Sequence, residues 1–282
     1  MKIRDLIILI TGFVAMIAAH MPQDAVAQEA PNALRLWKDG KVIAETNTIV
    51  DSIVLFVLPA QLPPQILDPT SVGGVAPTAD QAIDMGLSVK WAPWNVGASK
   101  PEEYGGYFAW GEINASKESY DWGSYYWMAE GEVADWKHIN KYQSPEVANN
   151  DEKEGDWWRN GQFIGDGIAC LERSDDAATA NWGSGWRMPT LSEWEELLDE
   201  NNTDITLIEN YNDSGLYVLE VKSKKTDGVL FFSDISEYWT TCTLGVCGTA
   251  AAYGAVIGMR YVGAPMSRCE GHLIRAVAVP AE

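Results

Sequence analysis

The distribution of tryptophan most constrains how this chain can fold. All 13 tryptophans lie at or before Trp239, and residues 240–275 contain none. That segment has a single acid, Glu270, in a chain of net charge −20, and it holds three of the four cysteines. Tryptophan buries a large area with one polar hydrogen to satisfy, so the earlier part of the chain supplies most of the core. The later segment is therefore predicted to be a chemically mixed surface set into an aromatic scaffold.

The first 27 residues have the three parts of a secretory signal peptide. Lys2 and Arg4 form a positive start, residues 6–19 are apolar, and residues 25–27 form an A-x-A cleavage site. We expect export through the Sec pathway to the periplasm, the cell surface or the medium, with an uncleaved anchor as the alternative. No second long apolar run follows, so we expect no transmembrane segment in the mature chain.

The remaining chain divides into a small β segment, a linker and one large domain. Residues 28–58 contain two short apolar stretches around Asp39-Gly40, a hairpin turn signal, and a further apolar strand at 53–58. Residues 59–79 are a linker rich in proline and glycine. Residues 80–282 are predicted to be the main domain.

Within the main domain the pattern predicts an α+β fold with much irregular structure. Residues 82–92 resemble an edge or closing strand. Residues 114–167 lack clean periodicity and are predicted to be irregular but packed, with these anchors: Trp122, Trp127, Trp136, Trp157 and Trp158. Strands are predicted at 216–222, 228–232, 238–243, 252–259 and 272–280.

Two short helices are predicted between these regions. The first runs from Asp175 or Asp176 to about Asn181, with an aspartate as its N-cap. The second follows a capping box formed by Thr190 and Glu193, and it ends at Asn201-Asn202. Its apolar residues fall on one helical face: Leu191, Trp194, Leu197 and Leu198.

Three stretches of the main domain carry a resemblance to known families. They are 85–92 (MGLSVKWA), 103–112 (EYGGYFAWGE) and 176–197 (DAATANWGSGWRMPTLSEWEEL). Together they resemble the Fibrobacter succinogenes major paralogous domain and related exported proteins of Bacteroidetes. The WRMPT-x-x-EW core is also similar to the formylglycine-generating-enzyme superfamily. Both resemblances imply a C-type-lectin-like fold for residues 80–282, and they make core residues of Trp91, Trp110, Trp182, Trp186 and Trp194.

The C-terminal segment resembles the variable region of diversity-generating-retroelement proteins. In these lectin-like proteins, adenine-specific mutagenesis rewrites codons near the 3′ end of the gene, which changes the ligand-binding surface. The resemblance implies a variable region at 240–272, with an unmutated strand after it. It implies ligand contacts at Cys242, Leu244, Val246, Cys247, Thr249, Tyr253, Arg260, Tyr261, Arg268 and Glu270. Tyrosine and arginine dominate interface energetics, although ordinary strand surface is the alternative for these residues.

Catalysis receives little support from the sequence. His138 and His272 stand in no nucleophile or metal motif, and we interpret both as surface or strand-end residues. The spacing of Cys242 and Cys247 is similar to the cysteine pair of formylglycine-generating enzymes, which would favour Cu(I). The arginine-rich flanks of those enzymes are missing here. A disulfide or two unrelated thiols are the alternatives, and we predict that the chain is not an enzyme.

Cofactors and nucleic acid are also not expected. The glycan-binding calcium tripeptides of lectin-fold proteins do not occur, and the acidic stretch 149–156 fits a solvated turn better than a Ca²⁺ loop. The acidic chain offers no cationic stripe for phosphates. We therefore predict an exported binding protein for an unknown protein or glycan ligand. A non-diversified adhesin or a structural subunit of the cell surface is the alternative.

Overall fold

The computed structural model describes two units of the chain, 1–57 and 58–282. The described residues are 34–38, 41–46, 65–68, 70–115, 117–129, 134–143, 155–213, 215–233, 236–243 and 251–279. The predicted signal peptide, the predicted strand at 53–58 and the first part of the predicted linker lie outside them. Of the helices in the described part, none has both the length and the apolar character needed to cross a membrane.

The first unit contains the predicted hairpin. Strands β1 (Leu34–Lys38) and β2 (Lys41–Thr46) pair antiparallel, with a register shift between Leu36 and Trp37. The strands lie on either side of Asp39-Gly40, as the turn signal predicted.

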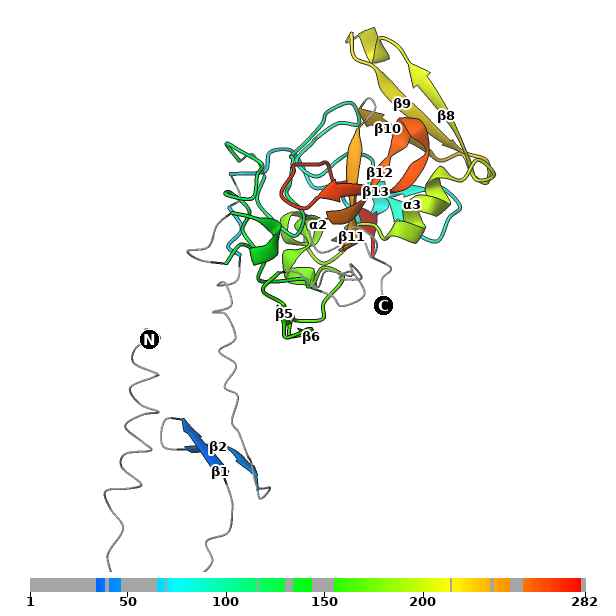
Figure 1. Cartoon of the computed structure of the whole chain (residues 1–282). Coiled ribbons are helices and arrows are strands. Elements are labelled where there is room, and N and C mark those ends of the chain that lie inside the picture. Colours follow the sequence, from blue (N-terminus) through cyan, green and yellow to red (C-terminus); the bar gives the residue numbers. More distant parts are fainter. Residues whose placement is uncertain are drawn as a thin grey trace, which may run out of the picture. The chain divides into compact units, whose positions relative to one another are not determined.

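In its described residues, the second unit contains two α-helices and several small antiparallel sheets (Figure 1). Its sheets have the strand orders β3-β4-β14-β7, β5-β6, β10-β9-β8 and β11-β12-β13. The architecture is mixed, with few helices, and fits an α+β or mostly β fold. The strands are β3 (Ile83–Asp84), β4 (Lys90–Trp91), β5 (Trp158–Arg159), β6 (Gln162–Phe163), β7 (Trp186–Arg187), β8 (Thr203–Ile208), β9 (Val218–Ser223), β10 (Val229–Ser233), β11 (Glu237–Thr243), β12 (Ala251–Val256), β13 (Tyr261–Ser267) and β14 (Val277–Ala278).

Both predicted helices form, because their caps are encoded locally. Helix α2 (Ala177–Trp182) begins after Asp176, whose carboxylate accepts from the Thr179 N–H at 2.9 Å. Helix α3 (Leu191–Leu198) has the complete capping box of Thr190 and Glu193. It ends earlier than predicted, since Asp199 already has an extended backbone.

Four predicted strands form with shifted boundaries, namely β9, β10, β11 and β12. The predicted strand 82–92 is two short strands, β3 and β4, which pair with each other. The stretch predicted at 252–259 stops at Val256, and a short 3-10 helix (Ile257–Met259) follows. Among the described residues of 272–280, strand β14 is the only named strand. The strands that were not predicted are β5, β6, β7, β8 and β13.

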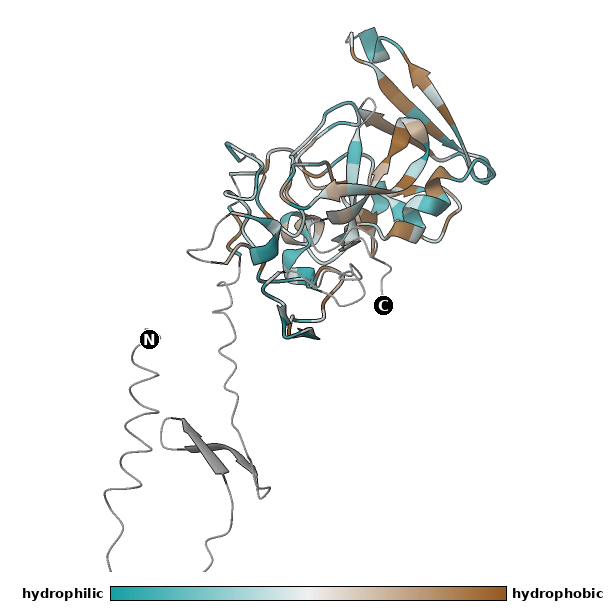
Figure 2. Cartoon of the chain, in the orientation of Figure 1, coloured by the Kyte–Doolittle hydropathy of each residue, from teal (hydrophilic) through white to brown (hydrophobic). Residues whose placement is uncertain are grey.

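The core has two parts, and strand β11 separates them. Successive residues of a strand point to opposite faces, so Tyr238 enters one cluster with Trp194 while Trp239 enters the other with Trp110. Figure 2 shows hydrophobic residues in the sheets and α3 and mainly polar ones in the loops. The sheet β11-β12-β13 is therefore covered on both faces near β11.

The tryptophan-rich stretch is packed as predicted, within its described residues. Trp127 and Trp157 are buried, and the other three anchors are partly buried against the same cluster. The tryptophans of the resemblance motifs also lie in the core, except that Trp182 is half-buried against Trp186.

Candidate functional site

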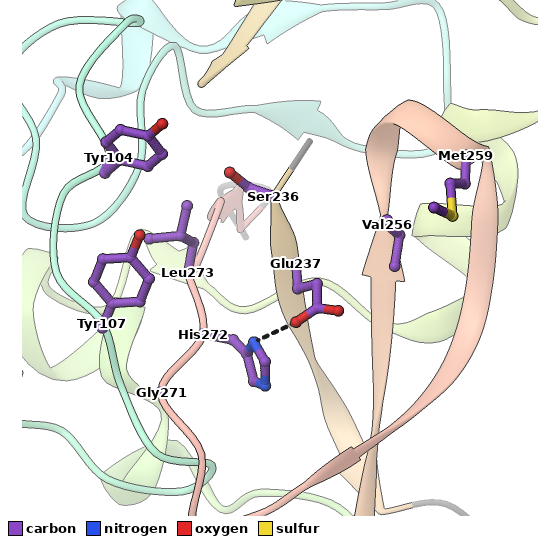
Figure 3. A pocket seen from close by; sticks show the side chains of 9 residues that line it. All are labelled: Tyr104, Tyr107, Ser236, Glu237, Val256, Met259, Gly271, His272 and Leu273. Carbon is purple, nitrogen blue, oxygen red and sulfur yellow. Dashed lines mark ion pairs between the residues drawn. The ribbon is translucent and has the colours of Figure 1, made fainter. Parts of the chain in front are cut away.

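A pocket of about 420 Å³ opens where strand β11, the end of β12 and the loop before Phe108 meet. Its volume lies in the range of small-ligand sites. Figure 3 shows two tyrosines on one side, Val256 and Met259 on the other, and Glu237 and His272 between them. The lining residues are Tyr104, Tyr107, Ser236, Glu237, Val256, Met259, Gly271, His272 and Leu273.

The two tyrosines are positioned by the glycine pair between them. Gly105 has φ of +80°, and a Cβ there would lie 2.4 Å from the Val96 carbonyl oxygen. The Gly106 N–H donates to the same oxygen at 2.8 Å. This close approach, which only glycine permits, leaves Tyr104 and Tyr107 each 43% exposed at the pocket.

His272 is the buried polar residue of the pocket. Its ring packs edge-on against Trp239, with centroids 4.6 Å apart. Its Nδ1 lies 3.1 Å from Glu237 Oε2, and its Nε2 lies 3.6 Å from Glu270 Oε2. Burial lowers the pKa of His272, and the two carboxylates oppose that shift without overcoming it. The imidazole is therefore neutral at pH 7.

The lowered pKa of His272 predicts a loss of stability in mild acid. An unfolded histidine titrates near pH 6.5, as is usual. Between that value and the lower folded pKa the unfolded chain binds more protons, so stability falls as the pH decreases through this window. Urea unfolding of the His272→Gln variant between pH 5.5 and 7.5 should show a weaker pH dependence than the wild type. An identical pH dependence of the unfolding free energy in the two proteins would contradict the lowered pKa of His272.

Three of the predicted contact residues lie at exposed or half-buried positions. Tyr261 is 50% exposed at the start of β13, and the Glu270 side chain is 55% exposed beside His272. Tyr253 on β12 is half-buried. Leu244, Val246, Cys247 and Thr249 lie outside the described residues.

The placement of two predicted ligand contacts, Arg260 and Arg268, is wrong, because both guanidinium groups donate to other groups of this chain. Arg268 is fully buried; its guanidinium lies 4.7 Å from the Trp110 ring centroid and donates to the Tyr125 hydroxyl and the Tyr142 carbonyl, each at 3.1 Å. Arg260 donates to the carbonyl of Leu198 at 2.8 Å, which ties the turn to the end of α3.

Cys242 is half-buried and is not a partner of Cys247. It forms a disulfide with Cys170, beside backbone hydrogen bonds from Leu171 to Thr241 and from Thr243 to Ala169. The hypothesis of a thiol pair at 242 and 247 is therefore wrong. Cys269 is buried, and burial raises the pKa of its thiol.

Several pocket residues were missed by the sequence reasoning. Tyr104 and Tyr107 were treated as parts of a structural motif and His272 as an ordinary strand-end residue, while Glu237 was not considered. A usable signal was the arrangement of Tyr104 and Tyr107 around two glycines, which is typical of a tight turn that presents side chains.

Metal binding has no support within the described ranges, where no group of three His, Cys, Asp or Glu side chains could hold an ion. Most of the acidic stretch 149–156 lies outside those ranges. Asp156, at its end, lies 2.9 Å from His138 Nδ1.

Comparison with protein families, with curated proteins and with solved structures gives no match for this chain.

Proposed function

We propose that the chain is an exported ligand-binding protein, in which a lectin-like scaffold displays a variable binding surface. The observation that carries this proposal is the pocket at the edge of the sheet β11-β12-β13. Residues of the predicted variable region, Met259 and Gly271 among them, line it together with residues of the aromatic frame. A preorganised frame limits the ordering cost of binding while the contacting side chains change. The ligand is a protein or a glycan, and the mechanism is recognition.

The motif residues behave as parts of such a frame. Asp176 caps α2 and also accepts from the Met188 N–H at 2.8 Å. Arg187 forms an ion pair with Glu193 at 2.5 Å, which fixes the strand before α3 to the capping box. The proposed relation to the C-type-lectin-like variable proteins of diversity-generating retroelements in Bacteroidetes rests on the sequence resemblance, and these contacts fit the rigid frame that it requires. Delivery through the Sec pathway to the periplasm, cell surface or medium belongs to the same proposal.

Two alternatives remain open to experiment. A non-diversified adhesin or structural subunit would use the same frame without codon rewriting, and it would fractionate with surface filaments. A formylglycine-type copper enzyme requires reduced Cys242, which is bonded to Cys170. That bond favours the binding protein over the enzyme.

The DNA around the gene tests the proposal. We expect a near-identical template repeat and a reverse transcriptase gene nearby, with adenine-specific differences confined to the codons of the variable region. A locus with neither element would overturn the diversification and favour the adhesin.

A further inference from the structure

The pocket at Glu237 and His272 has an uncompensated negative charge. The Glu237 side chain is 51% exposed, and no lysine or arginine is among the described residues that line the pocket. Arg260, on the neighbouring turn, is engaged by Leu198 and Thr203. Because the buried imidazole of His272 is neutral, it does not cancel the carboxylate.

His272 leaves a hydrogen-bond acceptor unsatisfied beside this charge. A neutral imidazole carries one N–H, and the shorter contact assigns it to Nδ1, which faces Glu237 at 3.1 Å. Nε2 is then a bare acceptor; it is buried without a hydrogen bond and faces the Glu270 carboxylate at 3.6 Å. His272 is 9% exposed, at the wall of the pocket. If the exposed Glu270 side chain rotates, a ligand with several N–H donors would donate to both His272 Nε2 and the Glu270 carboxylate.

The walls of the pocket suit the same ligand. Cations are attracted to the faces of tyrosine rings, and Tyr104 and Tyr107 are both part-exposed on one side of the pocket that Glu237 also lines. Opposite them, Met259 is 71% exposed, and methionine adapts its shape to the stem of a long side chain. The net charge of −20 would also attract a basic ligand over distance.

We propose that this pocket binds the guanidinium or ammonium group of an arginine or lysine side chain on a protein ligand. The inference deepens the proposed function and rests on it. Glu237 forms the ion pair, the tyrosine rings cover the cation, and Glu270 with His272 Nε2 accepts its remaining hydrogens. A neutral sugar could also stack on tyrosine, but it would leave the carboxylate without a counter-charge.

A titration with capped tripeptides tests the proposal. The full chain without its predicted signal peptide is labelled with ¹³C at the methionine methyl groups, and Met259 serves as the reporter. The probes are acetyl-Gly-Xaa-Gly-amide with Xaa as arginine, lysine or glutamine, together with methyl glycosides. We expect the arginine and lysine peptides to shift the Met259 signal and to bind about tenfold more tightly than the glutamine peptide, the difference expected for one charged hydrogen-bonded contact.

Variants separate the pocket from the general acidity of the chain. Glu237→Gln keeps the shape and should raise the Kd of the arginine peptide about tenfold. Glu195 is an exposed residue of α3 and does not line the pocket. The control variant Glu195→Gln also removes one negative charge, and it should leave the Kd of the arginine peptide unchanged. Equal losses in both variants would overturn the proposal, since attraction to the acidic surface alone would explain them.

Two further outcomes would also overturn it. They are equal binding of the glutamine and arginine peptides, and a methyl glycoside that shifts Met259 more than either cation does. Both results would leave the proposed function intact if a ligand still binds the predicted variable region. A locus without template repeat and reverse transcriptase would instead remove the diversification, even with a working cation pocket.

Discussion

Removal of the Cys170–Cys242 disulfide is expected to lower the free energy of unfolding by about 4 kcal/mol. The bond closes a sequence separation of 72 residues, and a long closed loop strongly restricts the unfolded chain. The bond also holds the strand end at Thr241 and Thr243 against residues 169–171, where two backbone hydrogen bonds of 2.8 Å form. Loss of the bond is therefore expected to loosen the packing of residues 241–243, at the start of the predicted variable region, against residues 169–171.

The measurement is urea unfolding of Cys170→Ala/Cys242→Ala, followed by tryptophan fluorescence. Cys269→Ala is the matched control, because it removes a buried thiol without breaking a disulfide. We expect the control to lose much less stability than the double variant. Equal losses in the two proteins would mean that the thiol volumes, and not the cross-link, supply the stability.

Trp239→Ala is expected to cost about 3–5 kcal/mol, the usual range for removal of a buried tryptophan. Trp239 is fully buried on β11, and its indole N–H donates to the Phe108 carbonyl at 2.7 Å. Its ring also supports His272 at the base of the pocket. The substitution therefore leaves a large cavity and removes one of the two N–H donors to the Phe108 carbonyl, which still accepts from the His272 N–H at 3.0 Å.

Trp182→Ala makes the same chemical change at a half-buried site. Its loss of stability, measured in the same urea titration, should be clearly smaller than that of Trp239→Ala. Similar losses would contradict the placement of Trp239 at the centre of the frame.

The locally encoded parts of the fold could be predicted from the sequence. Helix α3 depends on Thr190 and Glu193, three residues apart, and the N-terminal hairpin depends on one Asp-Gly turn. Strand β13 was missed because Gly263 and Pro265 look like turn residues, although Pro265 is exposed and β13 is an edge strand that tolerates proline.

The candidate site could not be predicted, because its parts meet only in the folded chain. Arg268 is buried by Tyr125 and Tyr142, which lie more than a hundred residues earlier. Cys170 gave no local sign that it would reach Cys242. The pocket likewise joins Tyr104 and Tyr107 to residues near the C-terminus, so composition drew attention to the segment but did not indicate which residues line the pocket.

The division between a fixed frame and an exchangeable surface is tested most directly by the Tm values of two matched sets of variants. One set randomises the exposed residues Met259, Tyr261 and Glu270, and the other randomises the buried residues Met266, Arg268 and Leu273. Surface substitutions usually change stability by less than about 0.5 kcal/mol each, so the first set should melt within a few degrees of the parent. The second set should lose cooperative unfolding in most variants. Equal losses in the two sets would contradict a frame that tolerates change at its surface.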